Sequence, residues 1–468
     1  MMRSMTLSEL RPVLNAELSG ADLAFTRVST DTRNLHRGDL FLALRGENFD
    51  GHRFIDEAVA KGAVAVVAEE CAQTTVPVLK VADTLRALGQ IASVNRKRFA
   101  GPVIAVTGSN GKTTVKELLR RVLLQQGPVL ATQGNLNNAI GAPLTLLQLA
   151  PEHKAAVIEL GASGPGEIAW TASLAAPEVS ILTNAGEAHM AGFGSYQGLV
   201  EAKGEIISET AREGVVVLNL DDPAFEVWRA LAGGRTVVSV SAQGNQEADI
   251  YARNIVESAA GLVFEARQRD GAAFSISLRL AGVHNVGNAL LAVAATRAIG
   301  VEAAVIEAGL AATDPVKGRM QVLSLGPTIT VIDDSYNANP TAMRAALKTL
   351  GERGGNRVAV LGDMAELGGD EAFQHQEIGA LARKLGIDYL YVTGRYAEDY
   401  ARGFGEGCNI ATSHSRLFDM LDNELFGSAS TSAGLQGADQ VRVTLLVKGS
   451  RSARMDQIVA LLNEKVKP

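Results

Sequence analysis

The stretch VIAVTGSNGKTTVKELL (Val103–Leu119) joins a short apolar run to a glycine-rich bend and then to a helical pattern. Gly108 and Gly111 allow backbone N–H groups to turn inward around phosphate oxygens. The helix expected to begin near Lys112 directs the positive end of its dipole at the same point. The stretch therefore predicts a phosphate-binding loop between a buried strand and a helix.

This loop matches the usual phosphate-loop pattern only in part. The eight-residue pattern requires glycine five residues before Gly111, and that position holds Val106. Lys112 is expected to reach the terminal phosphates, and the Thr113 hydroxyl is expected to hold Mg²⁺. A glycine turn followed by a solvated lysine is the structural alternative. The residues expected to contact the nucleotide here are Gly108, Ser109, Asn110, Gly111, Lys112, Thr113 and Thr114.

A phosphate loop indicates a nucleotide but not a reaction. A GTP-dependent switch ordinarily carries N-K-x-D, which we do not find in the sequence. A motor or transport ATPase ordinarily shows an apolar strand that ends in Asp, whereas the candidate strand Ala155–Leu160 ends around Glu159. Both classes are disfavoured relative to an enzyme that uses ATP on a small substrate.

The composition describes a folded chain of several domains. At 468 residues, 47% hydrophobic and 20% charged, about three domains are expected. A formal charge of −7 argues against a general binder of nucleic acid or anionic membranes. Cys71 and Cys408 lie far apart and indicate neither a disulfide framework nor a cysteine metal site. Because no signal peptide or apolar run of about 18 residues is present, we expect a cytoplasmic protein without a membrane span.

Short apolar strands alternate with helical patterns along the chain, which predicts an α/β fold with parallel sheets. A nearly all-apolar strand at 63–68 indicates a first sheet covered on both faces. A weaker alternating pattern between Asp249 and Leu280 predicts a small antiparallel excursion. The expected domains are 1–100, 101–315 and 316–468. Other expected segments are strands at Phe41–Leu44, Val103–Gly108, Ala155–Leu160, Val179–Asn184, Val215–Leu220 and Thr330–Asp334, and an exposed loop at Ser428–Gly437.

Seven motifs, read in order, give a more specific indication. They are TGSNGKTT, IELGASGPGEI, NAGEAH, EAKGEI, GVHNVGNALLA, KGRMQ and DDSYNANP. The set resembles the Mur ligase family of ATP-dependent amide-forming enzymes. The resemblance implies three domains: an N-terminal domain for a UDP-linked substrate, a central ATP-binding domain with a P-loop and a parallel sheet, and a C-terminal Rossmann-like ligase domain.

Three further features resemble one branch of that family. They are STDTR with GDLFLALRGENFDGH, TQGNLNNAIGAPLTLL, and LGDMAELG with LVKGSRSARM. The branch adds D-alanyl-D-alanine to UDP-N-acetylmuramoyl-tripeptide. The resemblance therefore implies ATP and Mg²⁺ as cofactors and these two substrates. We further expect a monomer, and the charge and the N-terminus already favour a cytoplasmic protein with no nucleic-acid partner.

Besides Thr113, three residues are candidates for metal binding. Glu159 closes an apolar strand, where an unpaired carboxylate is costly, so it requires a cation or donors nearby. The resemblance makes it a Mg²⁺ ligand, and a satisfied structural carboxylate is the alternative. His189 is a second ligand by resemblance, although a lone histidine is more often structural. Lys203 reads by chemistry alone as a helical surface lysine, whereas the family carries a carbamylated lysine at the matching place.

Further residues are implied in nucleotide binding. Asn285 and Asn288 lie three residues apart and share one face near a helix start, where capping is the alternative reading. Arg319 carries a permanently charged guanidinium group with a forked set of donors, which suits phosphate. The resemblance implies that it binds the γ-phosphate. The resemblance also suggests that Asp334 contacts the ribose. Tyr336 and Asn337 would flank the nucleotide, and Asn339 before Pro340 is a helix start signal.

The remaining candidates concern the two substrates, and solvated loops are the alternative for each. A polar turn is expected to bind the uridine diphosphate group, a second segment faces the sugar-peptide, and a third binds peptide carboxylates. These residues are, in the same order, Ser29, Thr30, Asp31 and Arg33; Asn135 and Asn138; and Lys448, Ser450 and Arg451.

The mechanism implied by the resemblance is activation of a carboxylate by ATP as an acyl phosphate, followed by attack of an amine. The catalytic residues would be Lys112, Glu159, His189, Lys203 and Arg319. Because Asp334 and Lys112 belong to different domains, the third domain is expected to close over ATP. Two alternatives remain: another amide ligase of the superfamily, such as a folylpolyglutamate synthetase, and a nucleotide-binding regulator without ligase chemistry.

Overall fold

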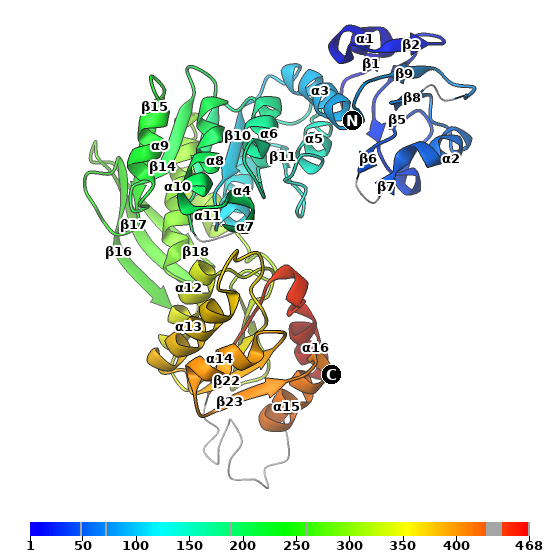
Figure 1. The fold of residues 1–468 in the computed structure, drawn as a ribbon. Coiled ribbons are helices and arrows are strands. Elements are labelled where there is room, and N and C mark those ends of the chain that lie inside the picture. The colour runs from blue at the N-terminus through cyan, green and yellow to red at the C-terminus, as the bar shows by residue number, and fades with distance from the viewer. Residues whose placement is uncertain (47–48, 71–72, 187–189, 259–260, 427–441, 467–468) are drawn as a thin grey trace.

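The computed structural model describes residues 1–46, 49–70, 73–186, 190–258, 261–426 and 442–466. Three separate α/β sheets, of five, nine and six strands, follow one another along the chain. Figure 1 shows the C-terminal unit below the central unit, while the N-terminal unit stands to the upper right of the central unit. The expected three-part α/β fold is confirmed, and the domain limits at residues 100 and 315 stay predictions that fall between the sheets.

The N-terminal sheet has the strand order β2-β9-β8-β5-β4. Its central strand β8, Ala65–Ala68, is buried along its whole length, as its apolar sequence predicts. The expected strands at 41–44 and 63–68 are displaced by one or two residues, because strand pairing begins at Leu40 and Ala65. The bounds are β1 (Met5–Thr6), β2 (Glu17–Ser19), β3 (Ala24–Phe25), β4 (Val28–Ser29), β5 (Leu40–Leu42), β6 (Arg45–Gly46), β7 (Phe49–Asp50), β9 (Val78–Lys80), α1 (Leu7–Leu14), α2 (Ile55–Ala60) and α3 (Thr84–Lys97).

Helix α3 joins the N-terminal unit to the central one. Its buried Asn95 donates through Nδ2 to the carbonyls of Leu146 and Leu149, at 2.9 and 3.0 Å. The neighbouring Arg96 donates through Nε to the Ala175 carbonyl at 2.7 Å. Polar groups this deeply buried require such partners. The helix thus attaches to the central unit through directional bonds as well as apolar packing.

The central sheet has the order β11-β12-β10-β13-β14-β15-β16-β17-β18 and is parallel as far as β16. Its last three strands pair antiparallel, which confirms the expected excursion and joins it to the same sheet. Strand β10 pairs Val106 with Glu159 of β12, so the phosphate loop and this carboxylate leave the same sheet edge. Parallel α/β sheets place their ligands at this edge.

The elements of the central unit are β10 (Val103–Thr107), β11 (Val129–Ala131), β12 (Ala155–Glu159), β13 (Val179–Leu182), β14 (Val215–Asn219), β15 (Thr236–Ser241), β16 (Ile250–Ser258), β17 (Gly261–Gln268), β18 (Ala273–Leu278), α4 (Lys112–Leu123), α5 (Gly141–Leu146), α6 (Glu167–Ala175), α7 (Met190–Phe193), α8 (Tyr196–Ser208), α9 (Phe225–Leu231), α10 (His284–Ala298) and α11 (Ala303–Ala311).

The C-terminal sheet has the order β19-β20-β24-β21-β22-β23 and is parallel except for the edge strand β19. Strand β24, the last of these in sequence, lies between β20 and β21. The expected loop at Ser428–Gly437 lies outside the described residues. The bounds are β19 (Gln321–Ser324), β20 (Ile329–Asp334), β21 (Asn356–Leu361), β22 (Tyr389–Thr393), β23 (Cys408–Ala411), β24 (Val443–Lys448), α12 (Pro340–Gly351), α13 (Glu371–Lys384), α14 (Ala397–Phe404), α15 (His414–Phe426) and α16 (Asp456–Val466).

In the part of the chain that the structure describes, no helix is both long and apolar enough to cross a bilayer.

Candidate active site

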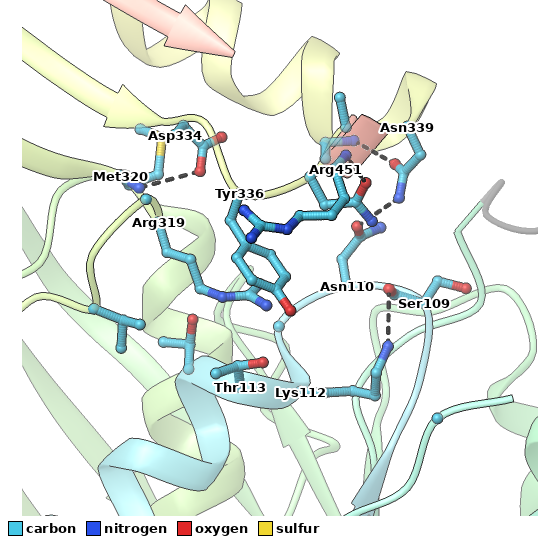
Figure 2. A pocket seen from close by; sticks show the side chains of 18 of the residues that line it. Ser109, Asn110, Lys112, Thr113, Arg319, Met320, Asp334, Tyr336, Asn339 and Arg451 are labelled. Atoms are coloured by element: carbon cyan, nitrogen blue, oxygen red, sulfur yellow. Dashed lines mark hydrogen bonds between the residues drawn. The ribbon is translucent and has the colours of Figure 1, made fainter. Parts of the chain in front are cut away.

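A cavity of about 680 Å³ lies between the central and C-terminal units. The phosphate loop, Glu159 and the start of α10 line one side, and the ends of β20 and β24 line the other. Figure 2 shows Ser109, Asn110, Lys112 and Thr113 facing Arg319, Tyr336 and Arg451 across this cavity. The structure thus brings together the nucleotide-binding candidates of both domains.

The phosphate loop has the conformation that its glycines allow. Gly111 precedes α4 with φ at 83°, and no side chain caps the helix there. A Cβ atom at this position would lie 2.4 Å from Oδ1 of Asn288. Glycine is therefore required both by the backbone angle and by the approach of α10. The uncapped N–H groups of α4 form a site suited to phosphate.

Lys112 is held within the loop. Its Nζ donates to the carbonyls of Gly108 and Ser109, at 2.6 and 3.3 Å. Burial lowers the pKa of Lys112, and the nearby charge of Arg319 lowers it further while Glu159 opposes the shift. The lysine therefore lies within electrostatic reach of a carboxylate from its own sheet and a cation from the other domain.

Glu159 has one satisfied and one unsatisfied carboxylate oxygen. The side chain is 2% exposed, and Oε1 accepts from Nδ2 of Asn137 at 2.8 Å. Among the described residues, Oε2 is buried with no hydrogen-bond partner. An orphaned carboxylate oxygen is costly in such a place, and oxygen is the ligand that Mg²⁺ prefers. The residue therefore fits a cation site better than it fits a satisfied structural carboxylate.

Lys203 is not a surface lysine, and that reading of the sequence is wrong. The side chain is 1% exposed, and its Nζ lies 4.9 Å from the centroid of the Phe193 ring. Burial lowers the pKa of Lys203 to about 7, assisted by the like charge of Lys112. An amine that is partly neutral at physiological pH has the chemistry that carbamylation requires. His189, the neighbouring candidate, lies outside the described residues.

The two asparagines of α10 bond to each other and not to free helix N–H groups. Nδ2 of Asn288 donates to Oδ1 of Asn285 at 2.8 Å, and Nδ2 of Asn285 donates to the Ala281 carbonyl at 2.7 Å. Both side chains are buried. Neither caps α10, which has no side-chain bond at its N-cap Val283, so the capping alternative is wrong. The pair instead holds Oδ1 of Asn288 against Gly111.

The C-terminal wall contains a buried ion pair. Asp334 and Lys448 are paired in the register of β20 and β24, and Nζ of Lys448 donates to Oδ2 of Asp334. Nζ also donates to the Asn337 carbonyl at 2.9 Å, while Oδ1 of Asp334 accepts from the Met320 N–H at 3.1 Å. Lys448, expected to bind a peptide carboxylate, is thus 2% exposed and bonded to the residue expected to contact the ribose.

Tyr336 lies between two arginines (Figure 2). The guanidinium carbon of Arg319 is 4.3 Å from the ring centroid and that of Arg451 is 5.6 Å from it. Arg451 is attached further by its backbone N–H, which donates to Oδ1 of Asn337 at 3.3 Å. The ring attracts both cations electrostatically and keeps two positive charges on the cavity wall.

Comparison with known proteins agrees with this geometry. Three models match the chain: Mur ligase family, catalytic domain (residues 24–96); Mur ligase middle domain (106–296); and Mur ligase, glutamate ligase domain (318–451). The UDP-N-acetylmuramoyl-tripeptide–D-alanyl-D-alanine ligase of Escherichia coli K12 is 41% identical, over 99% of both chains. The chain belongs to the Mur ligase family.

Solved Mur ligase structures show the same architecture. A MurF crystal structure from Acinetobacter baumannii matches with a TM-score of 0.91 and 34% identity, over 99% of both chains. The MurF ligase from Thermotoga maritima, in complex with ADP, matches with a TM-score of 0.82 and 26% identity, over 94% of this chain and 97% of that one. The match covers all three units and not the nucleotide-binding domain alone.

The candidate substrate residues of this Mur ligase are divided between two places. Asn135 and Asn138 line the cavity, where Oδ1 of Asn138 accepts from the Gly141 N–H at 2.8 Å. Ser450 and Arg451 line its opposite wall. The turn at 29–33 belongs to the N-terminal unit and does not line this cavity. Within that turn, Arg33 and Asp31 form an ion pair at 2.7 Å.

The sequence analysis missed several polar residues of the site, including Asn137, His284 and Thr132. Asn137 holds Glu159, although Asn135 and Asn138 were chosen from the same motif. His284 lines the cavity beside Asn285. Thr132 accepts the Glu159 N–H through Oγ1 at 2.9 Å. Each lies in a quoted motif, but only the tertiary fold shows which side chain of the motif faces the site.

Proposed function

We propose that this Mur ligase joins D-alanyl-D-alanine to UDP-N-acetylmuramoyl-tripeptide at the expense of ATP, in the synthesis of peptidoglycan precursors. The proposal rests mainly on one cavity, in which Lys112 faces Arg319 and Arg451. It is supported by the alignment of 99% of this chain with a UDP-N-acetylmuramoyl-tripeptide–D-alanyl-D-alanine ligase. ADP, phosphate and the UDP-muramoyl pentapeptide are the products.

The reaction has two steps. A terminal carboxylate oxygen of the tripeptide attacks the γ-phosphorus of ATP, the bond to the bridging oxygen breaks, and ADP leaves with an acyl phosphate formed. The free amine of D-alanyl-D-alanine then attacks the acyl carbon, loses a proton, and expels phosphate through a tetrahedral intermediate. No protein nucleophile is required, because phosphoryl transfer depends mainly on positioning and charge neutralisation.

The side chains divide these tasks by their positions. Lys112, released from the loop carbonyls, and Arg319 neutralise charge on the transferred phosphate. Gly108, Ser109, Asn110, Gly111 and Thr114 hold the phosphates. Asn285, Asn288, Asp334, Tyr336 and Asn337 bind the nucleoside from both domains.

The oxygen donors of Thr113 and Glu159 fit a magnesium site. Thr113, Glu159, His189 and a carbamylated Lys203 would hold Mg²⁺, together with phosphate oxygens. When bound, the metal neutralises phosphate charge and stabilises the developing charge on the acyl group.

The substrate contacts are assigned by position. The turn containing Ser29, Thr30, Asp31 and Arg33 would bind the uridine diphosphate group, with Asn135 and Asn138 along the sugar-peptide. Ser450 and Arg451 would bind the dipeptide carboxylate, with Lys448 as the buried support of that wall. We propose that the enzyme acts as a cytoplasmic monomer.

The test is phosphate release with Mg·ATP, the UDP-muramoyl tripeptide and D-alanyl-D-alanine, omitting each in turn and weighing the product by mass spectrometry. Release that requires all three, with one dipeptide added, is the expected result. Transfer of glutamate to a folate would indicate the folylpolyglutamate synthetase alternative. ATP turnover by folded protein that is indifferent to both peptide substrates would remove the proposal and favour a nucleotide-binding regulator.

A further inference from the structure

One wall of the cavity is a loop that follows β21, at Gly362–Asp370. Ala365 and Glu366 of this loop line the cavity. Glu366 and Asp370 have left-handed backbone, with φ at 60° and 53°. Such conformations are unfavourable for residues other than glycine and persist only where the surroundings hold them. The loop therefore requires support from its surroundings.

That support is His375, a fully buried side chain of α13. Its Nε2 accepts from the Met364 N–H at 2.9 Å, and its Nδ1 lies 2.6 Å from the Glu371 carbonyl. A backbone N–H can only donate and a carbonyl can only accept. The hydrogen-bond network thus assigns a neutral ring with its proton on Nδ1.

Aromatic side chains fix the plane of this ring. Tyr396 stacks on it with centroids 4.4 Å apart, and Tyr400 packs edge-on at 4.9 Å. The Tyr400 hydroxyl donates to the Gly362 carbonyl at 3.1 Å. Helices α13 and α14 approach closely because Gly379 and Gly403 lack side chains, since a Cβ at either would lie within about 2.1 Å of backbone oxygen. The imidazole cannot rotate away without opening this packing.

The same loop also holds the segment after β24. The Gly362 N–H donates to the Lys448 carbonyl at 2.9 Å, and the Ser450 N–H donates to the Asp363 carbonyl at 2.8 Å. The Asp363 carboxylate accepts from the N–H groups of Arg395 and Tyr396, at 2.8 and 3.0 Å. His375 therefore supports a unit that includes Glu366, Ser450 and the following Arg451.

We propose that His375 is a positioning residue that holds the 362–370 loop as the part of the cavity wall receiving the incoming dipeptide. The inference rests on the proposed function. A dipeptide is a zwitterion, and this wall carries both a carboxylate, Glu366, and a guanidinium, Arg451. The phosphate loop lies on the opposite wall, and the residues assigned to the nucleoside on this wall, Asp334, Tyr336 and Asn337, lie at and after the end of β20 and not in the 362–370 loop. Disturbance of His375 should therefore affect the dipeptide more than ATP.

Protonation of the ring would break the support, because Nε2–H would then face the Met364 N–H. Several titratable groups surround the ring: Glu371 on its own helix, Asp363 in the loop, and Tyr396, Asp399 and Tyr400 at α14. Burial lowers the pKa of His375, although the bond to the Glu371 carbonyl and the three carboxylates oppose that shift. The ring is therefore neutral at physiological pH.

The test compares H375F with H375Q in steady-state ligation. Phenylalanine keeps the aromatic packing but leaves the Met364 N–H unsatisfied, whereas the glutamine carbonyl can accept from it. We expect H375F to raise the KM for D-alanyl-D-alanine about tenfold, the effect of leaving one buried donor unpaired. The KM for ATP should change less than about twofold, and H375Q should restore most of the loss.

His153 gives the matched control. Its Nδ1 accepts from the Ala150 N–H at 3.0 Å, the same type of bond, but it does not line the cavity. H153F should leave both KM values unchanged. An H375F protein with native circular dichroism and unchanged KM for the dipeptide would overturn the proposal. Absence of dipeptide-dependent ligation in the wild type would instead remove the proposed function.

A second measurement does not require H375F to fold. The KM for the dipeptide should rise in the wild type as pH falls toward the pKa of His375 in the folded protein, which burial holds below the ordinary 6.5. H375Q cannot be protonated and should lack this rise. Parallel pH profiles for the two proteins would also overturn the proposal.

Discussion

Nδ2 of Asn339 donates to Oδ1 of Asn110 at 2.8 Å, joining the start of α12 to the phosphate loop of the other domain. Oδ1 of Asn339 meanwhile accepts from the Ala342 N–H at 2.8 Å and caps its own helix, as the sequence predicts. One amide thus serves a local and an interdomain role. Because Asn110 belongs to the loop that would hold ATP, the contact connects nucleotide binding to the placement of the C-terminal domain.

Replacement of Asn339 can separate these roles. N339S keeps a capping oxygen but is too short to reach Asn110, whereas N339A loses both bonds. We expect kcat/KM for ATP to fall about two- to tenfold in both variants, the value of one hydrogen bond. Thermal unfolding should show a loss of about 0.5–2 kcal/mol in N339A alone. Wild-type kinetics for N339S would show that the contact does not contribute.

The orphaned oxygen of Glu159 leads to a prediction about Mg²⁺. E159Q keeps the acceptor for Asn137 but removes the charge. We expect activity to fall about 100-fold and the Mg²⁺ concentration for half-maximal rate to rise, because the proposed metal site loses a charged ligand. The Tm should not decrease, since an unpaired buried charge is removed. An unchanged Mg²⁺ titration would count against a metal at this carboxylate.

Gly111 is predicted to be irreplaceable by alanine. At φ of 83° a side chain is strained, and its Cβ would lie 2.4 Å from Oδ1 of Asn288. Gly166 is the matched control, because it precedes α6 with φ of 82° and has open space around its Cβ position. We expect G111A to weaken ATP binding at least about tenfold by calorimetry, and G166A to cost only about 1 kcal/mol of stability. Equal ATP affinity in G111A and G166A would show that the clash between the added Cβ and Asn288 does not disturb the phosphate loop.

Lys203 should show opposite effects on stability and activity. K203M removes an ammonium group from a buried site but keeps a side chain of similar length. We expect a higher Tm at neutral pH in the absence of ligands, together with loss of ligation. K203R keeps the charge and cannot be carbamylated, so it should be inactive without the gain in Tm. Retained ligation by K203M would remove Lys203 from the proposed metal site.

His375 predicts how stability depends on pH. Its pKa in the folded protein is depressed below the ordinary 6.5 by burial. The unfolded chain therefore binds a proton that the folded chain does not, and stability present above pH 6.5 is lost as pH falls toward the folded pKa. The wild type should lose Tm over this interval, and H375Q should lose less. If the Tm of the wild type and of H375Q fell equally as the pH was lowered, a group other than His375 would control the loss of stability.

Local patterns were sufficient for much of the fold and of the nucleotide site. The order of strand, glycine loop and helix at Val103–Leu119 needs only apolar runs and glycine positions, and the helix begins at Lys112 as expected. Glu159 could be chosen because a carboxylate at the end of a buried strand is unusual in any fold. Both predictions could be made because they depend only on residues that are close together in the sequence.

The misses depend on contacts between distant segments. Lys203 lies in a helix whose sequence does not show that α7 covers it, so a surface position appeared reasonable. The pairing of Asp334 with Lys448 arises from the register of two strands more than 100 residues apart in sequence. His375 has no motif of its own, and its role is visible only when α13, α14 and the loop after β21 are assembled.

The position of β24 has a consequence for synthesis on the ribosome. Since β24 lies between β20 and β21, the C-terminal sheet remains in two separate parts until residues 443–448 have been translated. The phosphate loop and its nine-stranded sheet are complete long before that point and can fold as a unit. A nascent chain could thus acquire the loop while Ser450, Arg451 and Lys448 are still unmade. Enclosure of ATP by both walls of the cavity therefore requires that the chain has been translated through residue 451.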